Sequence, residues 1–191
     1  MERIKQLIQY LRLLPILPGI DWEDARFMMD LNRWKTVGSL TGSNSRVLAA
    51  LLWQKPEFRN LLIYRNRFRR FFRYWIAFWY RPMESLYIEA KEIGGGLFIQ
   101  HGFATMITAE AIGENCWINQ QVTIGYNGGG NAPVIGSSVM ITCGAKVLGP
   151  ITVGDRAVIG ANAVVIRDVE PGAVMGGVPA RVLRKEQIGG T

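Results

Sequence analysis

Branched aliphatic residues recur every six positions through the second half of this chain of 191 residues. The longer interval from Ile99 to Ile112 predicts two units plus a one-residue bulge, with Met106 as the intermediate apolar position. A repeat of six matches neither the two-residue alternation of an ordinary strand nor the 3.6-residue period of a helix. The repeating aliphatics are Ile93, Ile99, Ile112, Ile118, Ile124, Ile135, Ile141, Val147, Val153, Ile159 and Val165, and the residues in the fourth place after an aliphatic include Cys116, Val122, Val139, Ala145, Ala157, Ala163 and Val169.

A period of six residues is typical of solenoids in which each unit forms one short strand of a prism. Three strands make one coil, so the twelve units here predict about four coils, stacked at the usual strand spacing of ~4.8 Å. We expect the aliphatic side chains to form ladders inside the prism. Five residues beyond one unit separate Ile124 from Ile135, and they predict one projecting loop.

The N-terminal part of the chain differs in charge and in pattern. From Met1 to Leu86 there are 15 Lys and Arg against 7 Asp and Glu, whereas the remainder has 7 against 8. The basic character therefore belongs to the N-terminal part. We expect a basic, aromatic-rich helical domain over residues 1–86, a β-helix domain over 87–185 and a short tail over 186–191.

Helical apolar spacing covers residues 2–13 and resumes after Asp21. The Gly- and Ser-rich segment Gly38–Ser45 predicts a loop. Further helices are expected from Arg46 to about Trp53 and again after Pro56.

The two cysteines, Cys116 and Cys143, occupy repeat positions and lack the close pairing of a zinc site, so reduced thiols and no metal are expected. The segment over residues 1–20 lacks the pattern of a secretory signal. No apolar run approaches the ~20 residues that span a bilayer. We expect a cytoplasmic protein.

Residues 64–81 have the most unusual local composition, with nine aromatic residues, six arginines and no acidic residue. Three interpretations are open. The segment could be a core helix whose arginines reach water, a surface that contacts a membrane, or a nucleic-acid site. The lack of a known nucleic-acid module disfavours the last, and no nucleic-acid partner is expected.

His101 is the only histidine in the chain, and it lies on the repeat scaffold directly after Ile99 and Gln100. An imidazole, with a reference pKa of ~6.5, is suited to remove a proton from a hydroxyl at neutral pH. His101 is therefore a candidate general base, and the alternative is a solvated histidine on an outward position. Neither cysteine is paired with a base, so direct transfer is favoured over a covalent acyl-cysteine.

Several segments resemble the serine acetyltransferase branch of the left-handed β-helix acyltransferases. The resemblance covers about residues 86–185, and it implies an α+β protein in which N-terminal helices precede a left-handed parallel β-helix. The matching segments are 93–101 (IGGGLFIQH), 118–125 (INQQVTIG), 143–149 (CGAKVLG), 159–165 (IGANAVV) and 177–181 (GVPAR). Segment 56–65 (PEFRNLLIYR) shows a weaker similarity.

The resemblance implies acetyl-CoA as co-substrate, a homotrimer, and His101 as the catalytic base. It places acetyl-CoA along the backbone around Cys143, Gly144 and Ala161, with Arg181 or Lys185 near the phosphates. Gly125 would supply an oxyanion donor, with Tyr126 beside it, and the loop that follows would reach a neighbouring subunit.

The sequence departs from the family where the acceptor would bind. Gln100 stands where an aspartate usually precedes the histidine, and Leu86 stands at the place of the histidine's acidic partner. Asn131 and Ala132 replace an Arg-His pair in the loop. Glu84 or Glu89 could orient His101 instead, or a backbone carbonyl could do so.

This variant pattern is similar to that of acetyltransferases from capsule and exopolysaccharide loci. The leading expectation is an acetyl-CoA-dependent O-acetyltransferase that acts on a sugar hydroxyl of a surface polysaccharide or its precursor. Gln100, Asn127 and Asn131 are the expected acceptor contacts. The alternative is a serine O-acetyltransferase of cysteine biosynthesis, and a noncatalytic membrane-attached scaffold is disfavoured. A complex with cysteine synthase is not expected.

Overall fold

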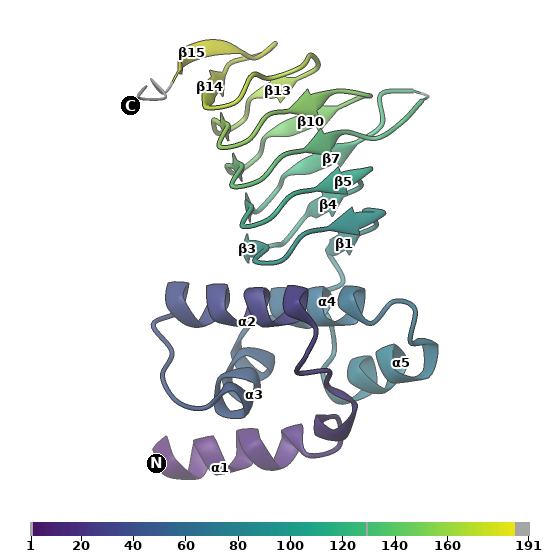
Figure 1. The fold of residues 1–191 in the computed structure, drawn as a ribbon, viewed down its shortest axis with the longest axis vertical. Coiled ribbons are helices and arrows are strands. Elements are labelled where there is room, and N and C mark those ends of the chain that lie inside the picture. Colours follow the sequence, from purple (N-terminus) through teal and green to yellow (C-terminus); the bar gives the residue numbers. More distant parts are fainter. Residues whose placement is uncertain (1, 129, 186–191) are drawn as a thin grey trace. The chain divides into compact units, whose positions relative to one another are not determined.

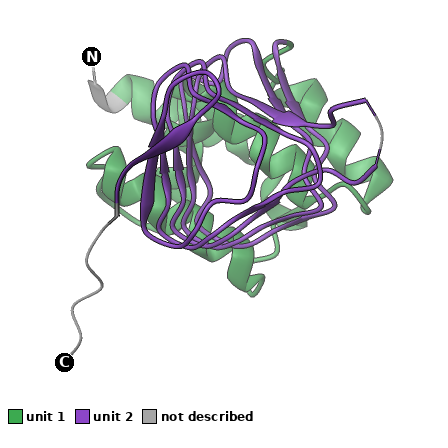
Figure 2. Cartoon of the chain, turned by 90° about the horizontal axis from the view of Figure 1, so that it is seen from above, with its two compact units in different colours: residues 1–84 green, residues 85–191 purple. Residues whose placement is uncertain are grey.

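The computed structural model describes residues 2–128 and 130–185. It divides the chain into two compact units, Met1–Glu84 and Ser85–Thr191 (Figure 2). The expected tail over 186–191 lies outside the described residues. Each unit is built from one kind of element (Figure 1).

The N-terminal unit is helical, and the expected helices are present with small shifts of their ends. A turn of 3-10 helix, η1 (Leu17–Gly19), separates the first two. Among the described residues no helix is long and apolar enough to cross a bilayer. The helices are α1 (Glu2–Leu13), α2 (Ala25–Val37), α3 (Asn44–Gln54), α4 (Pro56–Arg65) and α5 (Arg70–Trp79).

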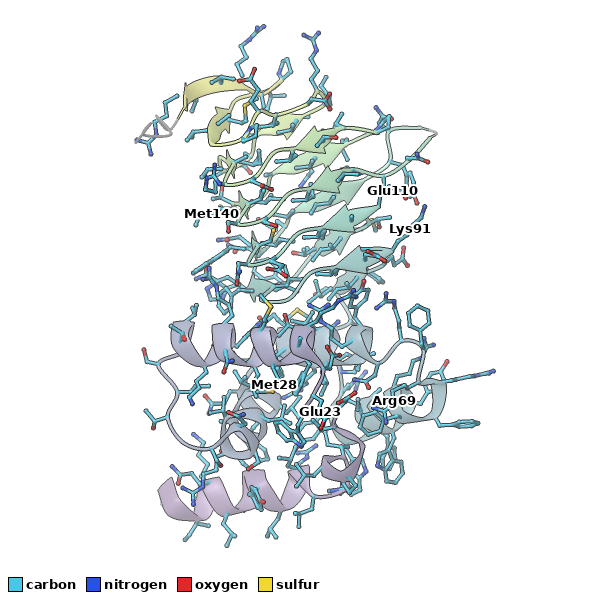
Figure 3. The ribbon with its side chains drawn as sticks, in the orientation of Figure 1. Glu23, Met28, Arg69, Lys91, Glu110 and Met140 are labelled. Carbon is cyan, nitrogen blue, oxygen red and sulfur yellow. The ribbon has the colours of Figure 1, made fainter. Side chains whose placement is uncertain are left out.

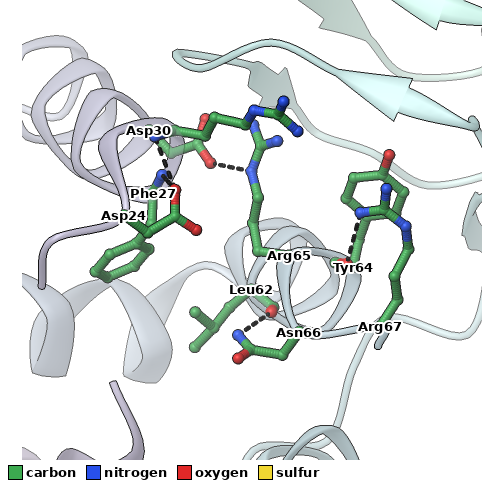
Figure 4. Close-up of polar contacts among 9 residues, drawn as sticks. Asp24, Phe27, Asp30, Leu62, Tyr64, Arg65, Asn66 and Arg67 are labelled. Carbon is green, nitrogen blue, oxygen red and sulfur yellow. Dashed lines mark hydrogen bonds and ion pairs between the residues drawn. The ribbon is translucent and has the colours of Figure 1, made fainter. Parts of the chain in front are cut away.

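Local sequence signals set the ends of these helices. The side chain of Asp24 accepts hydrogen bonds from the backbone N–H groups of Arg26 and Phe27, at 2.9 and 3.3 Å, and so caps α2. Pro56 occupies the first turn of α4, where its missing N–H leaves no bond unmade. Beyond α4, the Asn66 side chain donates to the Leu62 carbonyl at 2.9 Å (Figure 4).

The core of the helical unit combines aromatic packing with one buried ion pair. The rings of Trp34 and Phe58 meet edge to face, with 5.3 Å between their centroids. Arg65 on α4 binds Asp30 on α2 through two hydrogen bonds (Figure 4). Both side chains are almost fully buried, so this pair fixes α2 against α4.

The C-terminal unit is a parallel β-helix, as expected, with three strands in each turn. Its first face consists of β1 (Leu86–Ile88), β4 (Thr105–Ile107), β7 (Thr123–Gly125), β10 (Lys146–Leu148) and β13 (Val164–Val165). Its second face consists of β2 (Glu92–Ile93), β5 (Ala111–Ile112), β8 (Val134–Ile135) and β11 (Thr152–Val153). Its third face consists of β3 (Phe98–Gln100), β6 (Trp117–Asn119), β9 (Met140–Ile141), β12 (Val158–Ile159) and β14 (Ala173–Gly176), and β15 (Arg181–Lys185) pairs antiparallel with β14.

The left-handed β-helix has about five turns rather than the four expected, because β1 and β14 lie outside the counted run of aliphatics. The hexad aliphatics are all buried, and so are the small residues in the fourth place. The prediction of internal ladders is therefore confirmed. For example, Ile118 pairs with Ile99 below it and with Ile141 above it.

The prediction that Met106 fills an inward position is wrong. Met106 is 44% exposed, whereas the neighbouring Ile107 is fully buried and pairs with Ile124. The corner after β3 contains two residues in the left-handed backbone region, His101 and Ala104, with φ of 58° and 51°. This longer corner shifts the inward position by one residue.

Candidate active site

His101 occupies the corner between the third and first faces of the β-helix, directly after β3. Its side chain is exposed, and its carbonyl accepts a hydrogen bond from the Phe103 N–H within the turn. Among the described residues no hydrogen bond or ion pair joins the imidazole to a neighbour. The histidine is thus open to a ligand from outside the chain.

The strand register stacks the expected cofactor residues above His101. Gln100 pairs with Asn119, Ile118 with Ile141, and Ile141 with Ile159. Each of these pairings can be followed one or two residues further along its strands. Successive turns of the β-helix therefore place His101, Gln120, Cys143 and Ala161 at the same corner. At ~4.8 Å per turn, about 14 Å separates the first from the last.

Backbone hydrogen bonds hold this corner column together. Gly144 N–H donates to the Gln120 carbonyl at 3.0 Å, and Asn162 N–H donates to the Cys143 carbonyl at 2.9 Å. Gly144 has a left-handed φ of 72°, and a Cβ atom there would come within 2.0 Å of the Asn162 side-chain oxygen. A glycine is needed at this place.

Arg181 follows the top of the same corner column. Ile159 pairs with Met175, which puts Gly177 one turn above Ala161. Ala180 N–H then donates to the Val164 carbonyl at 2.8 Å, and the exposed Arg181 begins β15. The side chain of Lys185 lies outside the described part of the structure.

Gln120 is a further candidate site residue, which the sequence interpretation missed. It lies one turn above His101, and its side-chain oxygen is buried and has no hydrogen-bond partner in the part of the chain that the structure describes. A buried acceptor that lacks a donor is costly, by ~1–3 kcal/mol. The signal was available in the sequence, because Gln120 and Cys143 follow two hexad aliphatics at the same spacing.

Gln100 lies on the outer surface of the third face, beside His101. Its side-chain oxygen accepts hydrogen bonds from the Trp117 indole at 3.2 Å and, at the limit of contact, from the Asn119 amide at 3.5 Å. The Trp117 ring also packs edge to face on Phe98, with centroids 4.6 Å apart. The Gln100 amide is thus held in place and leaves its N–H groups as donors.

The projecting loop lies at a different corner, between the first and second faces (Figure 1). Gly125 ends β7, and Tyr126, Asn127 and Asn131 follow it on the exposed loop. Within one chain these four expected ligands are therefore not brought together with His101. A site that uses both groups needs a second subunit.

Two contacts anchor the loop to its own β-helix. Glu110 forms an ion pair with Lys91 one turn below, and these side chains are labelled in Figure 3. The other oxygen of Glu110 accepts a long hydrogen bond of 3.4 Å from the Ala132 N–H. The hydrogen bond from Lys91 is the main reason that the pKa of Glu110 is lowered and that of Lys91 raised. At the other end of the loop, Asn127 packs against Gly149, where a Cβ would meet its amide nitrogen at 2.5 Å.

The expected acidic partners of His101 belong to different parts of the chain. Glu84 belongs to the helical unit, where it forms an exposed ion pair with Arg81. Glu89 lies at the corner between β1 and β2, on the side of the loop. Leu86 is buried in β1.

Neither cysteine is part of a disulfide; Cys116 is buried and Cys143 is half-buried at the corner column. Among the described residues there is no group of three or more His, Cys, Asp or Glu side chains that could hold a metal ion.

This architecture is the left-handed β-helix fold of hexapeptide-repeat acetyltransferases. The sequence pattern of the family "Bacterial transferase hexapeptide (six repeats)" matches residues 132–167. Over 100 residues the chain is 45% identical to the serine acetyltransferase of Mycobacterium tuberculosis, a match that covers 50% of this chain and 43% of that protein. A similar protein from Helicobacter pylori strain J99 is 44% identical over 101 residues, covering 50% and 58%. The chain spans about half the length of the curated relatives it matches.

Solved structures of serine acetyltransferases are similar to this chain over a larger share of its length. The serine acetyltransferase of Neisseria gonorrhoeae in complex with serine has a TM-score of 0.64 and 26% identity, and covers 89% of this chain and 73% of that one. The soybean enzyme complexed with serine has a TM-score of 0.59 and 29% identity, covering 83% and 68%. These relatives are named for serine, the alternative acceptor, and not for a capsule or exopolysaccharide.

Proposed function

We propose that this protein is an acetyl-CoA-dependent O-acetyltransferase with His101 as its general base. The observation that carries the proposal is the corner column. It aligns the only histidine with Cys143, Gly144 and Ala161, which the sequence resemblance assigns to acetyl-CoA. An extended thioester lying along this column would bring its acetyl group to the imidazole.

The chemistry then needs one proton carrier. The imidazole of His101 takes the proton of the acceptor hydroxyl as the oxygen attacks the thioester carbonyl. The tetrahedral oxyanion collapses, the carbon–sulfur bond breaks, and the imidazolium returns the proton to the CoA sulfur. The products are the O-acetyl ester and free CoA. Backbone N–H groups are the natural donors to the oxyanion, and Gly125 of a neighbouring subunit is the candidate.

We infer that the site is shared between subunits of a homotrimer. Its two halves, His101 with the corner column and Tyr126 with the rest of the loop, lie at different corners of one β-helix. Closed cyclic assemblies bring two such surfaces together at every interface.

L-serine is the first acceptor candidate, because the relatives above are named for it and two of the solved ones hold it. A sugar hydroxyl is the second candidate, and it rests on the residues that stand at the family's acceptor-binding positions. Leu86 is buried and apolar, Ala132 is buried at the loop, and the oxygen of Gln100 is already occupied. The charged groups expected to grip an amino acid are therefore replaced.

An acceptor screen tests the function and separates the two candidates. Release of CoA thiol from acetyl-CoA is measured with L-serine, with monosaccharides and with oligosaccharides. Acceptor-dependent thiol release supports the proposal, and the acceptor with the highest kcat/KM identifies the substrate class. No thiol release above hydrolysis with any hydroxyl acceptor would contradict it.

A further inference from the structure

The outward side of α5 is an exposed aromatic surface. Phe71 and Phe78 are 90% and 76% exposed, and Tyr74 and Trp75 lie between them along the same side of the helix. Phe68, 86% exposed, extends this surface at the start of the helix. We call these five residues the aromatic surface. Interpretation of the segment as an ordinary core helix is wrong for this side, since only Ile76 of α5 is fully buried.

Contacts with the segment that precedes α2 anchor α5, so the aromatic surface is presented on a fixed element. Phe72 packs on Gly19, where a Cβ atom would come within 2.2 Å of the ring. The Trp75 indole donates to the Pro15 carbonyl at 2.9 Å, and Arg69 donates to the Gly19 carbonyl at 2.7 Å. Trp75 and Phe78 stack with 5.9 Å between centroids. Large exposed apolar patches of this kind mark interaction sites.

Arginines border the aromatic surface. The guanidinium of Arg67 lies over the Phe68 ring at 4.4 Å, and that of Arg73 lies over the Tyr74 ring at 4.7 Å. Arg70 is exposed at the start of the same helix, and Arg69, labelled in Figure 3, directly precedes it. No acidic residue occurs between Glu57 and Glu84, so the charge of the segment is strongly positive.

We propose that the aromatic surface and its arginines dock the protein on an anionic lipid bilayer. Basic residues around exposed aromatic rings match an interface in which anionic headgroups overlie acyl chains. Three of the five rings are phenylalanines without a polar end, which fits partial insertion better than stacking on nucleic-acid bases. With ten residues, α5 lies in the interface plane and does not cross the bilayer. The proposal does not depend on the acetyl-transfer function.

Vesicle flotation with the full chain tests this docking. We expect binding to phosphatidylcholine vesicles that contain one quarter phosphatidylglycerol, and at least tenfold weaker binding to pure phosphatidylcholine. Raising the salt to 0.5 M should weaken the binding several-fold, because part of it is electrostatic.

Paired variants assign the binding to this surface. The double change Phe71→Ser and Phe78→Ser should lower vesicle binding at least tenfold, and so should Arg70→Gln with Arg73→Gln. The matched controls are Ile166→Ser with Leu183→Ser, two exposed apolar residues of the β-helix, and Arg26→Gln with Arg46→Gln, two exposed arginines elsewhere on the helical unit. Both controls should bind as the wild type does.

A depth measurement separates insertion from adsorption. Lipids brominated on the acyl chains should quench tryptophan fluorescence in the wild type, and less so in Trp75→Phe. The proposal fails if the wild type ignores anionic vesicles at low salt, or if both test variants bind like it. A fall in the mass of the assembly for the Phe71 and Phe78 variant, without vesicle binding by the wild type, would instead make the surface a contact between copies of the chain.

Discussion

Asp30 and Arg65 form a bidentate ion pair that is almost entirely buried. The distances are 2.7 Å from Nε to Oδ2 and 3.1 Å from Nη2 to Oδ1, and the side chains of Arg65 and Asp30 are 4% and 1% exposed. These residues are 35 positions apart and join α2 to α4. A buried pair of this kind is sensitive to the loss of either member, because the other charge is then buried alone.

Asp30→Ala should therefore destabilise the helical unit by about 3–5 kcal/mol. The measurement is urea unfolding followed by tryptophan fluorescence. Glu23→Gln is the control, because Glu23 is an exposed acidic residue at the start of the same region, and it should change the free energy of unfolding by less than ~0.5 kcal/mol. Equal unfolding midpoints for the two variants would show that the pair contributes little.

His101→Asn should lower kcat by about 10²–10⁴, the usual scale for a general base. Asparagine tolerates the left-handed backbone that His101 adopts, so the corner should survive the change. The KM for acetyl-CoA should change little, because the imidazole acts mainly in the transition state. Arg156→Asn, at a left-handed corner of the β-helix away from the column, is the control and should keep full activity. Wild-type turnover by His101→Asn would exclude His101 as the base.

Gln120→Leu should reduce kcat/KM by about tenfold without loss of stability. The buried oxygen of Gln120 has no hydrogen-bond partner among the described residues, so removing it relieves a cost to folding, while a bound substrate loses an acceptor. Gln120→Glu retains the acceptor oxygen and should recover part of the activity. Melting temperature and steady-state kinetics are measured together. A variant that loses activity and stability in parallel would indicate a purely structural role.

The contact of Glu110 with Lys91 and Ala132 should weaken only in acid. The hydrogen bond from Lys91 lowers the pKa of Glu110 below its usual 4.5. A carboxylate whose pKa is lower in the folded protein stabilises it above the unfolded pKa, and this contribution disappears as the pH falls through the folded pKa. The Ala132 amide resonance, followed by NMR against pH, should shift with a midpoint below 4.5. In Glu110→Gln it should show no such transition.

A shared site predicts complementation between two inactive variants. His101→Asn lacks the base, and Tyr126→Ala with Asn127→Ala damages the loop at the other corner. Co-refolded mixtures should regain activity, because some interfaces then pair an intact histidine with an intact loop. Light scattering should show a trimer. Activity of an isolated monomer, or mixtures no more active than their components, would contradict a site shared between subunits.

Periodicity alone identified most of the β-helix. An inward position returns every six residues because one short strand and one corner take up six residues, and local spacing records this directly. The same periodicity predicted the internal ladders of aliphatic side chains. It failed at Met106, because the length of a corner depends on which residues adopt the left-handed backbone, here His101 and Ala104.

Other features needed the tertiary structure. Periodicity assigns no partner to Asp30, since the register between two helices is set by packing and not by spacing along the chain. In α5, the aromatic residues spread over a broad arc of the helix that includes both buried and exposed positions, so composition could not separate core from surface. The contact of Phe72 with Gly19 decides which side is buried and leaves Phe71 in solvent. The sequence by itself determined the β-helix, because its inward positions follow from local repeats. Only the tertiary structure decided the ion pair and the aromatic surface, because both depend on contacts between distant segments.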